Sequence, residues 1–416
     1  MAADLPPDRT LTLEDSVRLA LNNSQTILSV REDVDIALQR VRESESLFFP
    51  KLDLNANWNK FRVQNDTPLL VQPSLGPTLI PNSPRENFYT ARANIYQTVY
   101  EGGRVRNTWR QARISYERAR AADESLRVVV TVDAKQAFYD LLMAQEKSRQ
   151  YAALVERLRA FRPGDGAASL VERIHSESAL DALDAAAAQA TLEEQQARLA
   201  YLRMLNIELN TNVVLQGQLE TRPVKIDLQQ MLAWSSQYRS ELRQTQYQQE
   251  LDALGISLSL AERTPTVAFG ASYERTGNDI NLQTADWVGT LNVNLPVSIS
   301  DMFYGWAKVQ EHKAQFRQAE LKSFDTATQI EMQVRGAYAQ YQFWQNELVT
   351  RHDAAHRLER LVAEERARKT LPLSERADAE RLWLEAQLRY EEALHGHLMS
   401  LAALEKAVGH PLDNLP

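Results

Sequence analysis

The stretch PKLDLNANWNKF at residues 50–61 alternates apolar with polar side chains, and PTVAFGASYE at residues 265–274 repeats the pattern in the second half of the chain. Each is followed by another alternating segment, NFYTARANIYQ at residues 87–97 and DWVGTLNVNLP at residues 286–296. After each pair comes a long run rich in Ala, Glu, Gln and Arg, a composition typical of helices. A strand pair and a helical hairpin that occur twice predict an internal duplication.

The alternation in these four segments has the period of two that places successive side chains on opposite faces of a strand. Each segment runs for roughly 9–11 residues, the length that crosses a bilayer as a tilted strand. One face is apolar and the other carries Asn, Thr and charged residues, which indicates lipid outside and water inside. We therefore expect the polar residues to face the lumen, namely Asp53, Asn55, Arg92, Asn94, Asn292 and Asn294. We expect the aromatic residues of the other face to contact lipid, namely Trp58, Tyr89, Phe269 and Trp287.

An antiparallel sheet of a soluble protein, covered on one face by a helix, would show the same alternation. The abundance of Asn on the polar face favours a solvated lumen wall, because strand propensity disfavours Asn. Four strands cannot close a barrel, since closure needs about eight or more. Open sheet edges inside lipid would leave backbone groups unpaired. Strands in a membrane therefore predict a barrel shared between chains.

The composition limits the protein class. The chain has 416 residues, of which 44% are hydrophobic and 25% charged, and its formal net charge is −8. This balance excludes a disordered chain and a nucleic-acid binder held by bulk positive charge. There is no cysteine, which excludes disulfides and thiolate metal sites. The amino terminus, MAADLPPDRT, lacks the features of a signal peptide, so we expect either a cytosolic protein or a mature form with an added Met1.

The helical runs are too long for a compact domain. Residues 104–160 contain no Gly or Pro, and the break RPGDGAAS at residues 162–169 precedes a second helix ending near Asn206. The second copy runs from about Tyr304 to the break KTLPLS at residues 369–374 and then returns. At about 1.5 Å per residue, the longer arms reach on the order of 90–100 Å. Apolar residues recur at three- and four-residue spacing, which predicts coiled-coil-like packing between antiparallel arms.

These patterns divide the chain into two repeats and a linker. We expect the first repeat at residues 1–208, the linker at 209–226 and the second repeat at 227–416. Within the repeats, the predicted strand pairs and helical hairpins cover about 50–98 and 104–207, then about 265–297 and 303–408. The predicted fold class is mainly α with a membrane β-barrel.

The chain resembles the TolC-type outer-membrane efflux proteins. In the first copy the resemblance lies in LTLEDSVRLALNNS, FFPKLDLNANW, IYQTVYEGGRVRNTWRQA and RPGDGAASLVERIHSE, at residues 11–24, 48–58, 95–112 and 162–177. The second copy repeats the scheme through PTVAFGASY, LNVNLPVS and AYAQYQ. The resemblance implies a homotrimer in the outer membrane of a Gram-negative bacterium, with a twelve-stranded barrel that continues into a helical tunnel in the periplasm. It implies the exit duct of a tripartite efflux pump or type I secretion system, which works with a periplasmic adaptor and an inner-membrane transporter. It implies no catalysis.

The resemblance also points to residues at the far end of the helices. In family members, acidic side chains surround the lumen just after the turn that joins the two long helices of the second repeat. Glu375 and Asp378 are the positions of this chain that match them best. Asp165, in the first turn, is a further candidate for the aperture. The chain departs from the family by lacking Gly at the second turn and by having Ser300-Asp301-Met302 where the first copy has Gly102-Gly103.

No other motif predicts a catalytic, cofactor or metal site. His352 and His356 lie four residues apart on a helix, but no third ligand is evident, so a solvated helix face is the better interpretation. We interpret His395 and His397 as surface residues. The glycines of EGGRVR at residues 101–106 favour a strand-to-helix bend over a phosphate loop. A soluble helical scaffold or adaptor with a small sheet is the main alternative to a duct, and a metal-dependent hydrolase is the last.

Overall fold

The computed structural model describes residues 9–60, 70–71, 78–79, 87–160, 170–221, 225–295, 299–368 and 372–412. Most of these residues are helical, as the sequence predicts. The chain groups into two compact units, and each takes segments from both halves of the sequence. The helical unit comprises Met1–Asp35, Glu117–Tyr247 and Glu320–Pro416, and the sheet unit comprises Ile36–Tyr116 and Gln248–Ala319.

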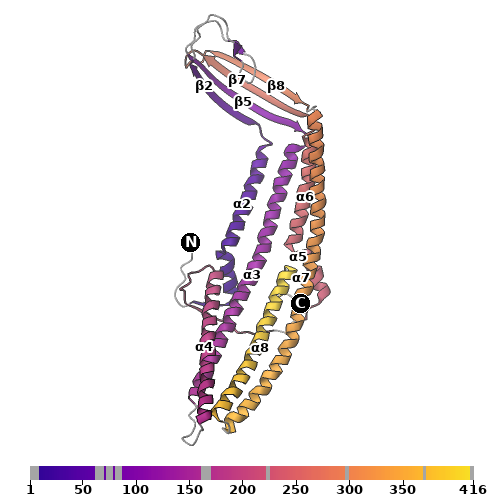
Figure 1. Ribbon diagram of the computed structural model, residues 1–416. Helices are drawn as coiled ribbons and strands as arrows, with labels where there is room; N and C mark the ends of the chain where they lie inside the picture. Colours follow the sequence, from indigo (N-terminus) through magenta and orange to yellow (C-terminus); the bar gives the residue numbers. More distant parts are fainter. Residues whose placement is uncertain are drawn as a thin grey trace. The chain divides into compact units, whose positions relative to one another are not determined.

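The sheet unit contains the four predicted strands, which are β2 (Lys51–Lys60), β5 (Asn87–Glu101), β7 (Thr266–Gly277) and β8 (Thr284–Asn294). They form one sheet in the order β2-β5-β7-β8, in which all neighbours are antiparallel (Figure 1). The strands of the first and second halves thus meet in the middle of the sheet, where β5 pairs with β7. Between β2 and β5, the short strands β3 (Leu70–Val71) and β4 (Thr78–Leu79) pair with each other.

A glycine pair connects β5 to the next helix, α3 (Arg104–Arg159). Gly102 and Gly103 have φ angles of 59° and 81°, in the left-handed region that other residues rarely adopt. A Cβ on Gly102 would also lie 1.8 Å from the hydroxyl oxygen of Thr264, so no larger residue fits. This confirms the predicted strand-to-helix bend.

The order of helix, two long strands, long helix and return helix occurs twice. The first set has α2 (Gln25–Ser46), α3 and α4 (Leu170–Met204), and the second has α6 (Ser240–Ala261), α7 (Ile299–Arg368) and α8 (Leu373–Val408). The helices end within a few residues of the ends predicted from the sequence, because Gly and Pro are scarce within the helical runs. None of the described helices has both the length and the apolar composition needed to cross a bilayer.

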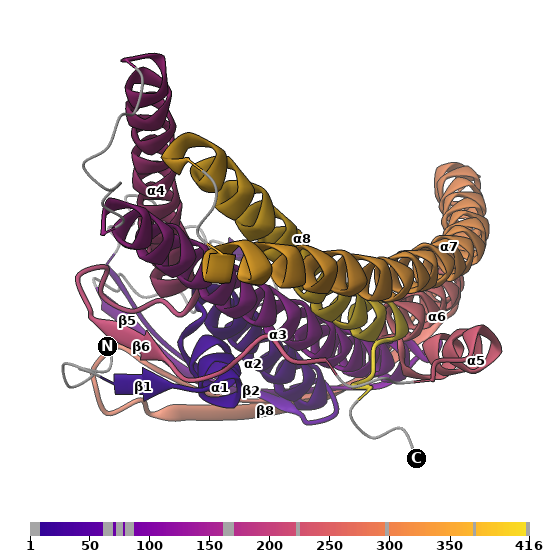
Figure 2. The ribbon, with the colours of Figure 1, turned by 90° about the horizontal axis from the view of Figure 1, so that it is seen from below.

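Two short helices, α1 (Leu13–Asn23) and α5 (Leu228–Tyr238), precede α2 and α6. The α1 helix begins with a capping box, in which Thr12 and Asp15 satisfy each other's backbone donors, and Asp227 caps α5 by accepting from the Gln230 amide. Just before α1, the strand β1 (Arg9–Leu11) pairs in parallel with β6 (Val213–Leu215) (Figure 2).

Separate apolar clusters hold the helical unit together. One surrounds Phe138, Tyr201 and Leu202, where the Tyr201 hydroxyl lies 2.6 Å from that of Ser16 and burial raises the pKa of Tyr201 to about 12. A second joins α3, α4 and α8 through Leu154, Leu183, Leu384 and neighbours, and a third joins α5, α7 and α8 through Met231, Val334 and Leu404. The coiled-coil-like spacing of the sequence therefore corresponds to packed contacts between helices.

Candidate functional site

The pairing register of the sheet gathers the predicted site residues onto two faces. On one face, Asp53 is paired with Asn94 and Asn55 with Arg92, and Arg92 is in turn paired with Glu274. Asn292 and Asn294 lie on the same face, opposite Ala268 and Thr266. All six lumen candidates thus share a face, because pairing in register preserves the alternation from strand to strand.

The opposite face carries all four predicted lipid-facing aromatic residues. Trp58 is paired with Tyr89, Phe269 with Leu291, and Tyr273 with Trp287. This face is bare in the single chain, since the side chains of Leu54 and Trp287 remain 75% and 81% exposed. A contiguous apolar surface of this kind marks an interaction site with another apolar phase.

The polar face differs in its electrostatics as well as its composition. The Arg92 guanidinium donates from Nε to Oε2 of Glu274 over 3.0 Å, and the two side chains are only 19% and 21% exposed. A sheet of a soluble protein buries its apolar face and solvates the polar one. Here the Arg92–Glu274 pair is more covered than the apolar side chains of Leu54 and Trp287, which is the inverse arrangement.

The sheet has two open edges. The strands β2 and β8 each have one neighbour among the described strands of this sheet. Their outer backbone N–H and C=O groups are therefore available for pairing with another strand. In water such groups bind solvent, but in a bilayer they need a protein partner.

The aperture candidates lie at the start of α8. Glu375 and Asp378 are both exposed and one helical turn apart. Asp378 Oδ1 lies 3.7 Å from Nε of Arg381, which also pairs with Glu385. Asp165 lies outside the described residues. The structure thus places two of the three candidates on one helical end.

A buried carboxylate near these candidates was not predicted from the sequence. Glu380 is 1% exposed and accepts hydrogen bonds from Arg366 over 2.6 Å and from Arg157 over 3.2 Å, which joins α8 to α7 and α3. Both guanidiniums also lie over the Trp383 ring, at 4.9 and 6.0 Å from its centroid. The hydrogen bond that Arg366 donates to Glu380 raises the pKa of Arg366. Nothing in the sequence around Glu380 distinguishes it from the solvated carboxylates of the same helix.

Known structures with this architecture are membrane channels. Over 95–96% of the chain, the fold matches the Campylobacter jejuni CmeC outer membrane channel, the Vibrio cholerae outer membrane protein VceC and the open state of the Neisseria gonorrhoeae MtrE outer membrane channel. The TM-scores are 0.76, 0.77 and 0.77, at 16%, 14% and 18% identity, and the matches cover 85%, 97% and 89% of those chains. No curated protein matches the chain significantly by sequence.

At these identities the solved structures show the fold alone. The model of the outer membrane efflux protein family matches residues 17–207, just under half of the chain. The first half of the chain is thus similar to that family in sequence. The matched residues include β2, β5 and the glycine bend into α3, which are the segments that carry the resemblance seen in the sequence.

The histidines form no metal centre in the described part of the chain, where no three metal-binding side chains come together. The rings of His352 and His356 lie 4.4 Å apart beside Tyr390 and line a groove of about 470 Å³ with Trp383. The interpretation of His397 as a surface residue was wrong. It is 3% exposed and packs on the Tyr341 ring, because its face of α8 is turned to α7, and burial lowers its pKa.

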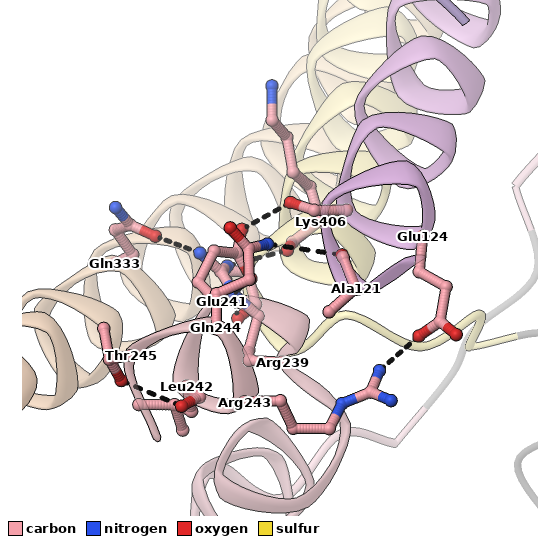
Figure 3. A network of polar contacts seen from close by, with 12 residues as sticks. Ala121, Glu124, Arg239, Glu241, Leu242, Arg243, Gln244, Thr245, Gln333 and Lys406 are labelled. Atoms are coloured by element: carbon pink, nitrogen blue, oxygen red, sulfur yellow. Dashed lines mark hydrogen bonds and ion pairs between the residues drawn. The ribbon is translucent and has the colours of Figure 1, made fainter. Parts of the chain in front are cut away.

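A groove of about 670 Å³ in the helical unit surrounds a buried arginine at the junction of α5 and α6. Arg239 donates to the backbone carbonyls of Lys406 and Ala407 over 2.9 and 3.0 Å, and to the Gln333 side chain (Figure 3). Since these carbonyls belong to the last turn of α8, the guanidinium caps that helix. The hydrogen bonds of Arg239 thus hold the end of α8 against the junction of α5 and α6.

Proposed function

We propose that this chain is one protomer of a homotrimeric exit duct in the outer membrane of a Gram-negative bacterium. The observation that carries the proposal is the four-stranded sheet, with an exposed apolar face, a polar face with a half-buried ion pair, and two open edges. Three copies supply twelve strands, enough to close a barrel around a water-filled lumen. Closure pairs β2 of one protomer with β8 of the next, a head-to-tail contact that a three-fold axis completes.

In this barrel the two faces of the sheet have separate roles. Asp53, Asn55, Arg92, Asn94, Asn292 and Asn294 line the lumen, and Trp58, Tyr89, Phe269 and Trp287 contact lipid. The two repeats, residues 1–208 and 227–416 joined by the linker 209–226, each contribute two strands and a helical hairpin. Their helices extend the duct into the periplasm as a tunnel.

At the far end of the tunnel, Glu375 and Asp378 line the aperture. Three-fold symmetry makes each of them a ring of three like charges, which favours cations. A periplasmic adaptor and an inner-membrane transporter deliver the substrate to this end. The chain needs no catalytic group, because its work is to provide a continuous aqueous path.

The assembly and its membrane location are tested together. Purified protein in detergent should have the mass of a trimer, and it should conduct ions in a planar bilayer. Leu54→Arg, on the apolar face, should reduce trimer yield strongly, because an arginine facing the middle of the bilayer costs about 2–4 kcal/mol. The neighbouring Asn55→Arg, on the polar face, should assemble normally. A monomer that remains soluble without detergent would instead support a helical scaffold.

The aperture residues need a separate measurement. The double variant Glu375→Gln with Asp378→Asn should lower cation selectivity and weaken block by divalent cations. The matched control is Glu32→Gln with Asp35→Asn, which removes two exposed carboxylates at the same spacing on α2. Unchanged selectivity in the first variant would show that Glu375 and Asp378 lie away from the aperture.

A further inference from the structure

We propose that the end of α2 and the first turns of α3 bind the phosphate headgroup of an anionic phospholipid, in the leaflet next to the helices. The site consists of Arg106, Arg110 and Arg113 with Phe48 and Trp109, and we call it the basic–aromatic site. The inference rests on the proposed function, since it requires the sheet to lie in a membrane. It adds a ligand class and a set of binding residues to that function.

The positive charge of the basic–aromatic site is not neutralised by the protein. Residues 102–116 contain four arginines and no carboxylate. Arg104 lies 3.8 Å from Glu101, but Arg106, Arg110 and Arg113 form no ion pair with any described residue, and all three are exposed. Their spacing of four and then three residues places them on one face of α3.

Aromatic rings adjoin this charged face. Trp109 and the three arginines fall within a sector of roughly 100° around the helix axis. Phe48 meets Trp109 edge to face at 6.5 Å, and the Arg113 guanidinium lies 5.6 Å from the centre of the Trp109 ring. Phe48 and Phe49 are 48% and 69% exposed, and both line a groove of about 380 Å³ beside Trp109. Glu45, which also lines this groove, is a single carboxylate against three guanidiniums.

Because of the direction in which α3 runs, these side chains point toward the membrane end of the helix. In a helix the Cα–Cβ bonds tilt toward the amino terminus, and the amino terminus of α3 follows directly on β5. Arg113 shows this tilt, since it reaches back one turn to cover Trp109. The headgroup layer is about 5–8 Å deep on each side of a bilayer. Arg110 lies about 9 Å along the helix from Arg104, so the side chains of Arg106 and Arg110 reach that layer.

The exposed aromatic rings favour lipid over the lumen as the surroundings of this face. Tryptophan and tyrosine gather where a bilayer meets water, and exposed phenylalanines would be unfavourable in a water-filled duct. Phe48 and Phe49 also run directly into β2, whose Leu52 and Leu54 are exposed on the apolar face. The aromatic end of the site therefore continues the lipid-facing surface, and the arginines extend it into the headgroups.

The start of α7 provides an internal comparison. It also exposes aromatic residues, namely Phe303, Tyr304 and Trp306. The first cation on α7 itself, Lys308, donates to Glu262 over 2.6 Å, so the charge of Lys308 is neutralised. We therefore expect this segment to touch the interface without a preference for anionic headgroups.

Native mass spectrometry of the full-length trimer tests the site. The protein is released from detergent micelles that contain equal amounts of phosphatidylglycerol and phosphatidylcholine. We expect preferential retention of phosphatidylglycerol by the wild type, and a loss of about fivefold or more in this preference in the triple variant R106Q/R110Q/R113Q. The control R335Q/R357Q/R360Q removes three exposed arginines from α7 and should retain the preference. Added inorganic phosphate should not displace the lipid.

Three outcomes would overturn the inference. The triple variant could keep the phosphatidylglycerol preference, inorganic phosphate could abolish it, or the variant could change ion selectivity in a planar bilayer with lipid retention unaltered, which would place the arginines in the duct. The masses in the same spectra separate this inference from the proposed function. An intact trimer without lipid preference contradicts only the basic–aromatic site, whereas a monomer contradicts the duct. If the triple variant does not assemble, Arg106→Gln and Arg110→Gln alone should each lower the preference partly, and no change in either would contradict the site.

Discussion

Leucines of the sheet and leucines of the helical unit have opposite surroundings in this chain. Leu54 is among the most exposed of its apolar residues, whereas Leu141 and Leu202 are at most 1% exposed. The helical unit satisfies its apolar side chains within a single chain, through clusters between neighbouring helices. The sheet cannot do so, since no described element covers its apolar face. The burial of an apolar side chain in the single chain therefore indicates its contribution to stability in the helices, but not in the strands.

The charged residues show the same contrast. In the sheet, Arg92 and Glu274 pair on the face opposite to the exposed leucines. In the helical unit, Glu380 is among the most buried charged residues described, and two arginines compensate it. The sheet therefore has its ion pair on the face away from its exposed apolar residues, whereas the helical unit buries the Glu380 ion pairs between its helices.

The largest effect that would test this contrast comes from shortening a leucine in each region. Leu141→Ala should destabilise the helical unit by about 2–5 kcal/mol, because it loses both transfer free energy and packing around a cavity. Leu54→Ala leaves no cavity and should cost about 1–2 kcal/mol, the transfer term alone. Thermal unfolding in detergent, followed by circular dichroism, would compare the two. Equal losses would mean that Leu54 is packed against protein in the assembly.

An intermediate effect is expected from the buried carboxylate. Glu380→Gln removes the charge that holds Arg157 and Arg366, and a hydrogen bond to a charged group contributes about 1.5–3 kcal/mol. Glu385→Gln, which breaks the more exposed pair with Arg381, should change stability by less than about 1 kcal/mol. Limited proteolysis of the helical ends should distinguish the variants. Indistinguishable cleavage would show that the pairing of α3, α7 and α8 does not depend on Glu380.

The smallest effect is a dependence on pH. Burial lowers the pKa of His397, so below about pH 6.5 the unfolded chain takes up a proton more readily than the folded chain. This histidine's contribution is therefore fully present above that pH and lost as the pH falls, by at most about 1.4 kcal/mol per pH unit. His397→Phe should flatten the curve of unfolding free energy against pH between pH 7 and 5.

Subtracting the variant's pH dependence of the unfolding free energy from that of the wild type isolates the contribution of His397. Glu391 contributes with the opposite sign, because burial raises the pKa of this carboxyl group. A wild-type curve already as flat as that of His397→Phe would show that solvent reaches this histidine in the assembly.

The strands and helices of this protein could be predicted because their signals are local. Alternation along β2 and β5 shows in a few consecutive residues, and the absence of Gly and Pro from Arg104 to Ala160 indicates an unbroken helix. The bend at Gly102 and Gly103 was predictable for the same reason, since only glycine suits its backbone angles. Which residues line the aperture stays a prediction, and Asp165 lies outside the described residues.

The sequence by itself determined which residues share a face of each strand, because successive side chains of a strand point to opposite faces. It also predicted that four strands in a membrane would need further strands from other chains to close a barrel. Only the tertiary structure decided that β5 and β7 lie at the centre of the sheet, that Glu380 is buried between two arginines, and that His397 faces α7 rather than solvent. The reason is physical: a charged or polar residue on a long helix has the same local pattern whether solvent or another helix lies opposite. Its partners come from segments hundreds of residues away, and packing alone selects them.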